Sequence, residues 1–482
     1  GSVVSTKDAD TLGTLPTEAT GSNPLDDAET RLRHLLRRTS FVALPAEVER
    51  YRGVPVERVV DDLLAQASID DSAAENMIAD FRFDAQKPAD VIGTWVTRLM
   101  HTERPVVERM TLFWHGLLTS GLTKIPKQYH YVMLTQNQFF RDHAFDKFEV
   151  LLKGVVRDPA MMLWLDIQDS KKGHPNENYA RELMELFTLG AGNYTEQDVR
   201  ESARAHTGYS LEKERGFIFR PAQHDAGSKT FLGETGNFDA DNIVDIVLKQ
   251  DAAPEHFARA LFGFFAYPNP EPEVIAPIAL VARQSGFEAK QVLRAVLTSQ
   301  AFYSRKAYRA IVKSPVDFSI GALRLFESEI DARTLVGAMR AMGQTLLDPP
   351  NVAGWPGGRT WLGTSTWFAR VNGAAQLMNG GVFEEGRATK PGKATRPAGN
   401  APKIVAAKIN VLFAATPASA DDAIDQASRA TIDGWIGDEA RATLREYLDE
   451  GGGYASLPKT TQEQRLRGLA ALLLASPEYQ LG

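Results

Sequence analysis

Residues 176–190 bring acidic, amide and guanidinium side chains together in one short run, Asn-Glu-Asn-Tyr-Ala-Arg-Glu-Leu-Met-Glu-Leu-Phe-Thr-Leu-Gly. Helical spacing would place four polar side chains on one stripe: Asn178, Arg181, Glu182 and Glu185. If that stripe faces a cleft, its carboxylates could perform acid/base chemistry or bind a metal. If it faces water, it is an exposed helix side with an ion pair between Glu177 and Arg181, which is the commoner role of a charge run.

A second candidate is the loop that begins at His224, which combines a base, an acid and a cation within six positions. Asp225 could supply a second carboxylate, and His224 and Lys229 could bind substrate, because loops held by a scaffold often carry function. An Asx turn or a salt bridge that holds the loop in place would explain Asp225 and Lys229 about as well.

Tryptophans gather in the irregular segment 347–367, which holds three of the seven in the chain. An indole offers an apolar face and one N–H donor, so Trp355 and Trp361 could bind the flat face of a sugar ring. Tryptophans also pin long loops to a core, and this role is expected for at least one of the three. Another aromatic pair, Trp114 and His115, closes an amphipathic helix, where a lone histidine is more often a hydrogen-bonded core residue.

The elements that must position these residues are predicted to be helices. Apolar residues recur at helical spacing in segments separated by Pro- and Gly-rich connections: 28–39, 45–51, 55–67, 88–102, 105–120, 127–143 and 144–156. Strand-like alternation is scarce, with 216–220 as its best short example. The pattern predicts a mostly α protein, a multi-helix globular core with long irregular loops and little or no β-sheet.

Composition divides the chain into four predicted parts. Residues 1–26 are polar and lack apolar periodicity, so we expect a flexible leader, whose first Gly-Ser pair has the form of a protease-cleavage remnant. Residues 27–385 would form the main helical domain with the candidate site. Residues 386–402 are basic and contain no large apolar residue, which is typical of a linker or mobile loop. Residues 403–482 would form a C-terminal helical unit packed on the main domain.

Charge and cysteine content exclude several classes of function. A net charge of -7 and a pI of about 5.8 argue against nucleic acid as the main partner. The sequence contains no apolar run near the roughly 20 residues of a membrane span. Its lack of cysteine excludes disulfides, thiolate metal sites and a cysteine nucleophile. Nucleotide-binding glycine loops, the Gly-x-Ser-x-Gly elbow and the His-Glu-x-x-His motif are also missing.

The chain resembles the bacterial family known as domain of unknown function 1800. The resemblance rests on ordered blocks of sequence: Met110–His115, Arg157–Met161, Asn176–Gly190, Tyr194–Val199, Ala203–Tyr209, Lys313–Pro315 and Gly343–Gly358. It implies a mostly helical exported protein without a settled activity, often encoded beside a second exported family of sulfatase-like appearance. We therefore expect a secreted or periplasmic protein whose signal peptide has been removed. This chain has Gly116 and Leu117 where the family commonly reads Asn-His, which weakens any site that needs two histidines there.

From these residues we expect a secreted hydrolase that acts on an extracellular polymer, a glycan above all, in a Trp-lined cleft. Glycoside cleavage needs two carboxyl groups that face each other across the bond. The residues assigned to catalysis are Glu177, Glu182, Asp225 and His115. The residues assigned to substrate binding are Asn178, Arg181, His224, Lys229, Trp114, Trp355 and Trp361. This hypothesis needs no cofactor.

Two alternatives remain open. One is a metalloprotein that holds a divalent ion through oxygen and nitrogen donors, with Glu182, Glu185, His206 and His224 as its ligands. Against it, His206 shares a helix face with apolar Val199, which favours a structural role. The other alternative is a non-catalytic exported factor that binds a polymer or works in assembly with a sulfatase-like partner protein.

Overall fold

The computed structural model describes residues 22–81, 83–212, 216–379 and 405–482. Helices dominate these residues, and the strands form only two small antiparallel hairpins, which confirms the predicted mostly α class. The predicted linker 386–402 and most of the predicted leader lie outside the described residues. Within 22–26, Leu25 is fully buried and the Asn23 amide donates to the carbonyl of Tyr303, so packed structure begins before residue 27.

The first half of the chain forms a continuous series of helices. Their bounds are α1 Ala28–Ser40, α2 Pro45–Arg50, α3 Val56–Leu64, α4 Ser72–Asp80, α5 Pro88–His101, α6 Pro105–Leu117, α7 Val132–Asp142, α8 Phe148–Val155 and α9 Pro159–Trp164. Helix α7 is shorter than the predicted 127–143, because a 3-10 turn, Lys127–Tyr129, precedes it.

The middle of the chain contains the motif at 176–190 and both hairpins. Its elements are α10 Asn178–Glu182, a π-helix Leu183–Thr188, α11 Glu196–Ala205, β1 Tyr209–Glu212, β2 Gly216–Phe219, β3 Lys229–Phe231 and β4 Glu234–Gly236. Strand β2 is the segment that alternation predicted, and it pairs with β1 so that Tyr209 lies opposite Phe219. Strand β3 pairs with β4.

Helices resume after the second hairpin. They are α12 Ala240–Lys249, α13 Ala252–Phe265, α14 Pro272–Gln284, α15 Ala289–Thr298, α16 Pro315–Leu325, α17 Ala332–Ala341, α18 Thr364–Asn379, α19 Ala420–Ile432, α20 Asp438–Asp449 and α21 Lys459–Ala475. Further 3-10 turns are Pro24–Asp26, Gln66–Ser68, Ile167–Asp169, Pro221–Gln223, Gly358–Leu362, Ile409–Leu412 and Tyr454–Ser456.

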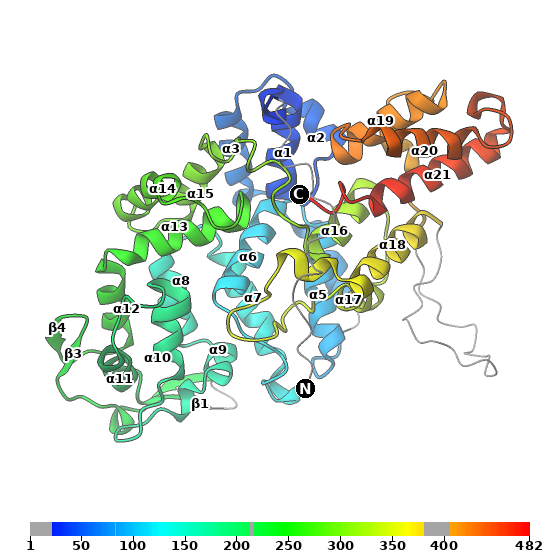
Figure 1. Cartoon of the computed structure of the whole chain (residues 1–482). Coiled ribbons are helices and arrows are strands. Elements are labelled where there is room, and N and C mark those ends of the chain that lie inside the picture. The colour runs from blue at the N-terminus through cyan, green and yellow to red at the C-terminus, as the bar shows by residue number, and fades with distance from the viewer. Residues whose placement is uncertain (1–21, 82, 213–215, 380–404) are drawn as a thin grey trace, which may run out of the picture.

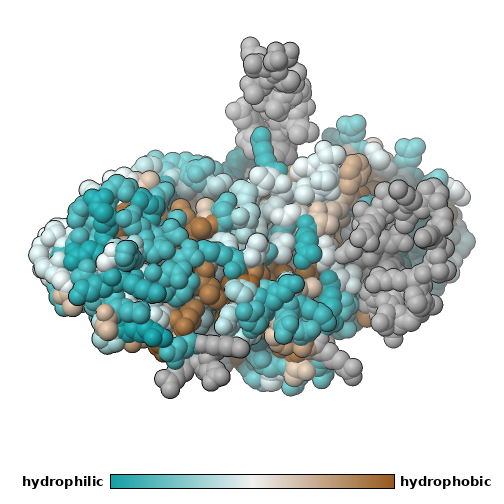
Figure 2. All heavy atoms as spheres, turned by 90° about the horizontal axis from the view of Figure 1, so that it is seen from below, coloured by the Kyte–Doolittle hydropathy of each residue, from teal (hydrophilic) through white to brown (hydrophobic). Residues whose placement is uncertain are grey.

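Two clusters of buried apolar residues hold these helices together. The first is built mainly from α1, α3, α6 and α8–α15, and the second mainly from α5 and α16–α21. In Figure 1, α8 and α12–α15 accordingly lie on one side, α16–α21 lie on the other, and α5–α7 run between them. Figure 2 shows the molecule from below, where hydrophilic surfaces flank a central zone with exposed brown, apolar atoms.

Capping boxes in the local sequence explain where α11 and α16 begin. Helix α11 starts at a capping box in which Thr195 accepts from the N–H of Asp198 and the Asp198 carboxylate accepts from the N–H of Thr195. Helix α16 starts at an equivalent box formed by Ser314 and Asp317. No helix in the described part of the chain has the length and apolar composition of a membrane span.

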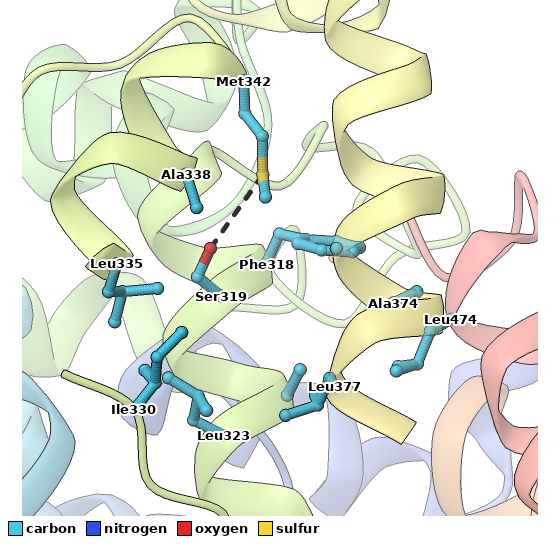
Figure 3. Close-up of a pocket in the computed structure, with 12 residues that line it drawn as sticks. Phe318, Ser319, Leu323, Ile330, Leu335, Ala338, Met342, Ala374, Leu377 and Leu474 are labelled. Atoms are coloured by element: carbon cyan, nitrogen blue, oxygen red, sulfur yellow. Dashed lines mark hydrogen bonds between the residues drawn. The ribbon is translucent and has the colours of Figure 1, made fainter. Parts of the chain in front are cut away.

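A small cavity of about 30 Å³ lies between α16, α17, α18 and α21. Its walls are almost entirely apolar; the Ser319 hydroxyl there donates to the Met342 sulfur over 4.0 Å (Figure 3). Such a cavity has room for one water molecule but offers it few polar partners. None of the predicted site residues lines it, so it is a packing feature of the second cluster.

Candidate functional site

The predicted polar stripe lies on α10 and the π-helix, and most of its side chains have partners on neighbouring elements. Both Nη atoms of Arg181 donate to the Glu196 carboxylate at 2.8 Å, and Glu177 lies 3.6 Å from the same guanidinium. The Asn178 amide donates to Asp166 at 3.0 Å. Two members of the stripe, Asn178 and Arg181, and the neighbouring Glu177 therefore have hydrogen-bond or ion-pair partners, as expected for a stripe that faces water.

Glu182 and Glu185 differ from the rest of the stripe. The Tyr194 hydroxyl donates to Glu185 at 2.7 Å. Among the described residues no donor lies within hydrogen-bonding distance of the Glu182 carboxylate, which is partly buried. Burial and the neighbouring charge of Glu185 raise the pKa of Glu182, and Arg181 opposes the rise. One carboxylate of this pair is stabilised by a hydrogen bond while the other favours its protonated form.

The pair lies where the helix changes from α to π geometry. The N–H groups of Leu189 and Gly190 both donate to the carbonyl of Met184, and Gly190 ends the turn with a φ of 82°. From α13, His256 donates through Nε2 to the carbonyl of Leu186 at 2.9 Å. A π-helical turn is uncommon and is often found at functional sites.

Asp225 is held by arginine rather than presented to a cleft. Arg204 donates to its two oxygens at 2.7 and 3.2 Å, and the N–H of Gly227 donates at 2.9 Å. The Arg204 guanidinium and this backbone bond lower the pKa of Asp225 to about 2. At neutral pH Asp225 is ionised and already paired, so it cannot act as a general acid.

The rest of the His224 loop is also fixed by internal bonds. The buried Lys229 ammonium donates to the carbonyls of Asp225 and Gly227 at 2.6 and 3.0 Å. His224 donates through Nδ1 to the carbonyl of Thr207 at 2.9 Å. These contacts match the structural interpretation of the loop, and they leave little of Lys229 for a substrate.

Trp114 and His206 lie in the core. Trp114 is fully buried, donates to the carbonyl of Ala144 and stacks on Phe148 and Phe257, so its assignment to substrate binding is not compatible with this position. His206 packs edge-on against Tyr179, and burial lowers the pKa of its imidazole to about 4.

His115 is 1 % exposed and lies between Trp95 and Trp355, with ring centroids 5.7 and 5.5 Å away. Its Nε2 has no hydrogen-bond partner among the described residues. Burial lowers the pKa of His115 to about 3, so the ring is neutral at physiological pH. It packs against Trp355, and it is not among the groups that shift the pKa of Glu182.

The tryptophan segment is anchored along the loop that follows α6. The N–H of Leu122 donates to the carbonyl of Leu347, and Thr123 donates twice to Asp348, at 2.8 and 2.6 Å. Gly354 approaches so closely that a Cβ there would lie 3.1 Å from the carbonyl of Gly116, and its φ is 84°. Despite this anchoring, the segment keeps four aromatic side chains partly or largely exposed: Trp355, Trp361, Trp367 and Phe368.

The connection formed by residues 164–176 contacts the three predicted pieces of the site: the polar stripe, the region of the tryptophan segment and the region of the His224 loop. On one side Asp166 accepts from Lys124 at 2.7 Å, beside the anchor of the tryptophan segment, and also from Asn178. On the other side the N–H of Lys172 donates to the carbonyl of Gln223. The three predicted pieces are therefore linked through one connection. Two cavities in the described chain lie elsewhere, near Ser319 and along α20.

The four predicted metal ligands do not converge. Within the described residues no group of three or more His, Asp or Glu side chains is close enough to share an ion. His206 faces Tyr179 in the core and His224 faces Thr207, whereas Glu182 and Glu185 lie on the π-helical turn.

Sequence reasoning overlooked several residues that complete these arrangements. Tyr194, which holds Glu185, directly follows the motif at 176–190 and could have been found as its nearest polar aromatic. Phe368 was missed because its helix reads as ordinary amphipathic sequence. Asp166 has a left-handed backbone with φ of 58°, which no sequence pattern announces.

Comparison with known proteins gives a family and nothing beyond it. No curated protein and no solved structure matches the chain. A family model described as "Protein of unknown function (DUF1800)" matches residues 34–481. The match covers nearly the whole chain, and the protein therefore belongs to the DUF1800 family.

Proposed function

We propose that this protein is an exported glycan-binding protein that uses the aromatic surface of residues 355–368. One observation carries the proposal: a firmly anchored segment leaves Trp355, Trp361 and Trp367 partly exposed and Phe368 61 % exposed. Burying such rings normally stabilises a fold, so aromatic side chains held at a surface favour a role in binding.

The chemistry around the rings suits a sugar. Indole and phenyl faces pack against the apolar C–H faces of a pyranose, and the indole N–H donates to hydroxyls. Exposed Arg359 lies between the tryptophans in the sequence and offers further donors. Because the hydrogen bonds to Leu347 and Asp348 fix the segment beforehand, binding would require little additional ordering.

Retention on a panel of insoluble polysaccharides tests the proposal. We expect the wild-type chain to bind at least one glycan, and Trp361→Ala and Phe368→Ala each to weaken that binding about tenfold or more, as loss of a well-packed aromatic contact does. Tyr131→Ala is the matched control, since Tyr131 is an exposed aromatic outside the segment. Glycan binding that survives the Trp361→Ala, Phe368→Ala double variant unchanged would refute the assignment.

A second candidate function, glycoside hydrolysis, is favoured by Glu182. Its raised pKa and the lack of a hydrogen-bond partner among the described residues suit a general acid, and Glu185, which accepts from the Tyr194 hydroxyl, suits the base or nucleophile. In this version Glu185 replaces Asp225, which is paired with Arg204. Release of reducing sugar from a bound glycan should fall at least about 100-fold in Glu182→Gln and stay unchanged in Glu273→Gln, an exposed glutamate on α14.

Export, and cooperation with a sulfatase-like partner protein, are parts of the same proposal that rest on the family resemblance. Co-purification with the sulfatase-like protein encoded beside it, from the periplasmic or secreted fraction, tests both. Elemental analysis of the purified protein tests the metal alternative, which requires a stoichiometric divalent ion.

A further inference from the structure

Acidic residues are nearly absent from the two pieces of chain that build the aromatic surface of residues 355–368. The pieces are residues 116–131, which anchor the tryptophan segment, and residues 332–379, which run from α17 through the segment to the end of α18. These 64 residues contain one acid, Asp348, whereas the chain average of 61 Asp and Glu in 482 residues would give about eight. We call the two pieces the acid-poor region.

The single acid of this region is already engaged. Both the N–H and the hydroxyl of Thr123 donate to the Asp348 carboxylate, at 2.8 and 2.6 Å. On the adjoining connection, Asp166 accepts from Lys124 at 2.7 Å and from Asn178 at 3.0 Å. An anion that approaches the aromatic rings therefore meets no carboxylate without a partner in the acid-poor region.

Two exposed arginines of this region lie near Trp361. Arg359 precedes it by two residues in the 3-10 turn Gly358–Leu362. Arg340 lies in the last turn of α17, and its carbonyl accepts from the N–H of Gly343 at 2.9 Å. A Cβ on Gly343 would lie 3.5 Å from the Trp361 indole, which brings the end of α17 to the ring. In the described part of the chain neither guanidinium has a hydrogen-bond or ion-pair partner.

The solvated state of these two arginines follows from the lack of acids around them. Elsewhere, Arg181 pairs with Glu196 and Arg294 pairs with Asp61. A guanidinium without a carboxylate partner keeps all its donors for an oxyanion from outside. An acid beside the rings would repel an anionic ligand, so a surface that combines exposed rings, cations and few acids favours anions over neutral sugars.

We propose that the ligand of the aromatic surface is an anionic polysaccharide, one that carries carboxylate or sulfate groups. The inference rests on the proposed glycan-binding function and names the class of glycan. The rings of Trp361 and Phe368 would pack on the sugar faces, and Arg340 and Arg359 would donate to the acidic groups, because a guanidinium binds oxyanions through several hydrogen bonds at once.

Binding to two pairs of soluble polymers tests the inference. Each pair shares one backbone and differs in charge: dextran sulfate against dextran, and carboxymethyl cellulose against hydroxyethyl cellulose. We expect the wild-type chain to bind at least one charged polymer about tenfold more tightly than its neutral counterpart, and this preference to fall as sodium chloride rises, because exposed charges are screened. The pair that shows the preference distinguishes sulfate from carboxylate.

Variants show whether the two arginines carry the preference. The double variant Arg340→Gln, Arg359→Gln should bind the charged polymer about three- to tenfold more weakly and bind the neutral one unchanged. Trp361→Ala should weaken both, since the ring packs on the sugar itself. The matched control is the double variant Arg429→Gln, Lys459→Gln, which removes two exposed cations from α19 and α21 and leaves the acid-poor region intact.

The outcomes separate this inference from the function on which it rests. If no polymer of either kind is bound, glycan binding fails and the inference fails with it. If charged and neutral polymers bind equally, or if the control variant weakens binding as much as the arginine variant does, the inference alone is overturned. Tighter binding of a single-stranded oligonucleotide than of any polysaccharide would also overturn it and would assign the surface to nucleic acid.

Discussion

At the scale of single residues, the function of each acid depends on its partner. Asp225 and Glu182 are both carboxylates from candidate motifs, yet Arg204 lowers the pKa of Asp225 while burial and Glu185 raise that of Glu182. Only the second has the protonation behaviour of a general acid. The two histidines beside aromatic rings show no such contrast, since burial lowers the pKa of both His115 and His206.

Asp225→Asn should reveal the Arg204 pair through the pH dependence of stability. Because the folded pKa of about 2 lies below the ordinary value of 3.8, the pair stabilises the fold fully above pH 4 to 5 and loses this contribution as pH falls toward 2. We expect the variant to be less stable by about 1 to 2 kcal/mol at pH 7, with the gap closing in acid. Urea unfolding between pH 7 and 2.5 measures it. Asp80→Asn, at an exposed position, is the control, and a gap independent of pH would contradict the assignment.

At the scale of elements, α10 and the π-helix position Glu182 and Glu185. The end of the aromatic segment lies on α18, which packs on α17 and α21. Helix α18 carries Phe368 at its outer face and packs along α21 on its inner face. The small cavity between these helices shows that packing there is already incomplete (Figure 3).

Leu474→Ala should enlarge this cavity and destabilise the protein. Leu474 is fully buried on α21 and forms part of the cavity wall, so truncation removes buried methyl groups beside an existing void. We expect a loss of about 2 to 5 kcal/mol in the free energy of unfolding, measured by chemical denaturation. Leu472→Ala, on the same helix but 45 % exposed, should cost well under half as much. Equal losses would mean that burial beside the cavity does not increase the contribution of Leu474 to the free energy of unfolding.

At the scale of the whole molecule, one buried acid ties the C-terminal helices to the start of the chain. Asp433 follows α19 with a left-handed backbone and accepts from Arg37 of α1 and from Arg309. Helices α19–α21 also share the second apolar cluster with α5, α16, α17 and α18. The C-terminal segment therefore completes a common core.

Asp433→Asn should destabilise the whole fold. Removing the charge leaves Arg37 and Arg309 buried without a counterion, which typically costs about 3 to 5 kcal/mol. The two arginines hold the pKa of Asp433 far below its ordinary value, so the difference from wild type should persist down to about pH 3. Calorimetric unfolding measures the loss. Glu446→Gln, at an exposed site on α20, should leave the stability unchanged. If Asp433→Asn also leaves the stability nearly unchanged, the ion pairs of Asp433 with Arg37 and Arg309 do not hold the C-terminal helices in place.

The sequence alone was sufficient for features that depend on neighbours along the chain. Apolar spacing predicted α1–α3 and α5–α8, and alternation predicted β2, because these signals arise within a few residues. Only the tertiary structure decided the pairing of Asp225 with Arg204, the burial of Trp114 and the isolation of Glu182. Those outcomes depend on which elements meet in space, and the free energy of a buried charge or ring is set by groups far away in the sequence.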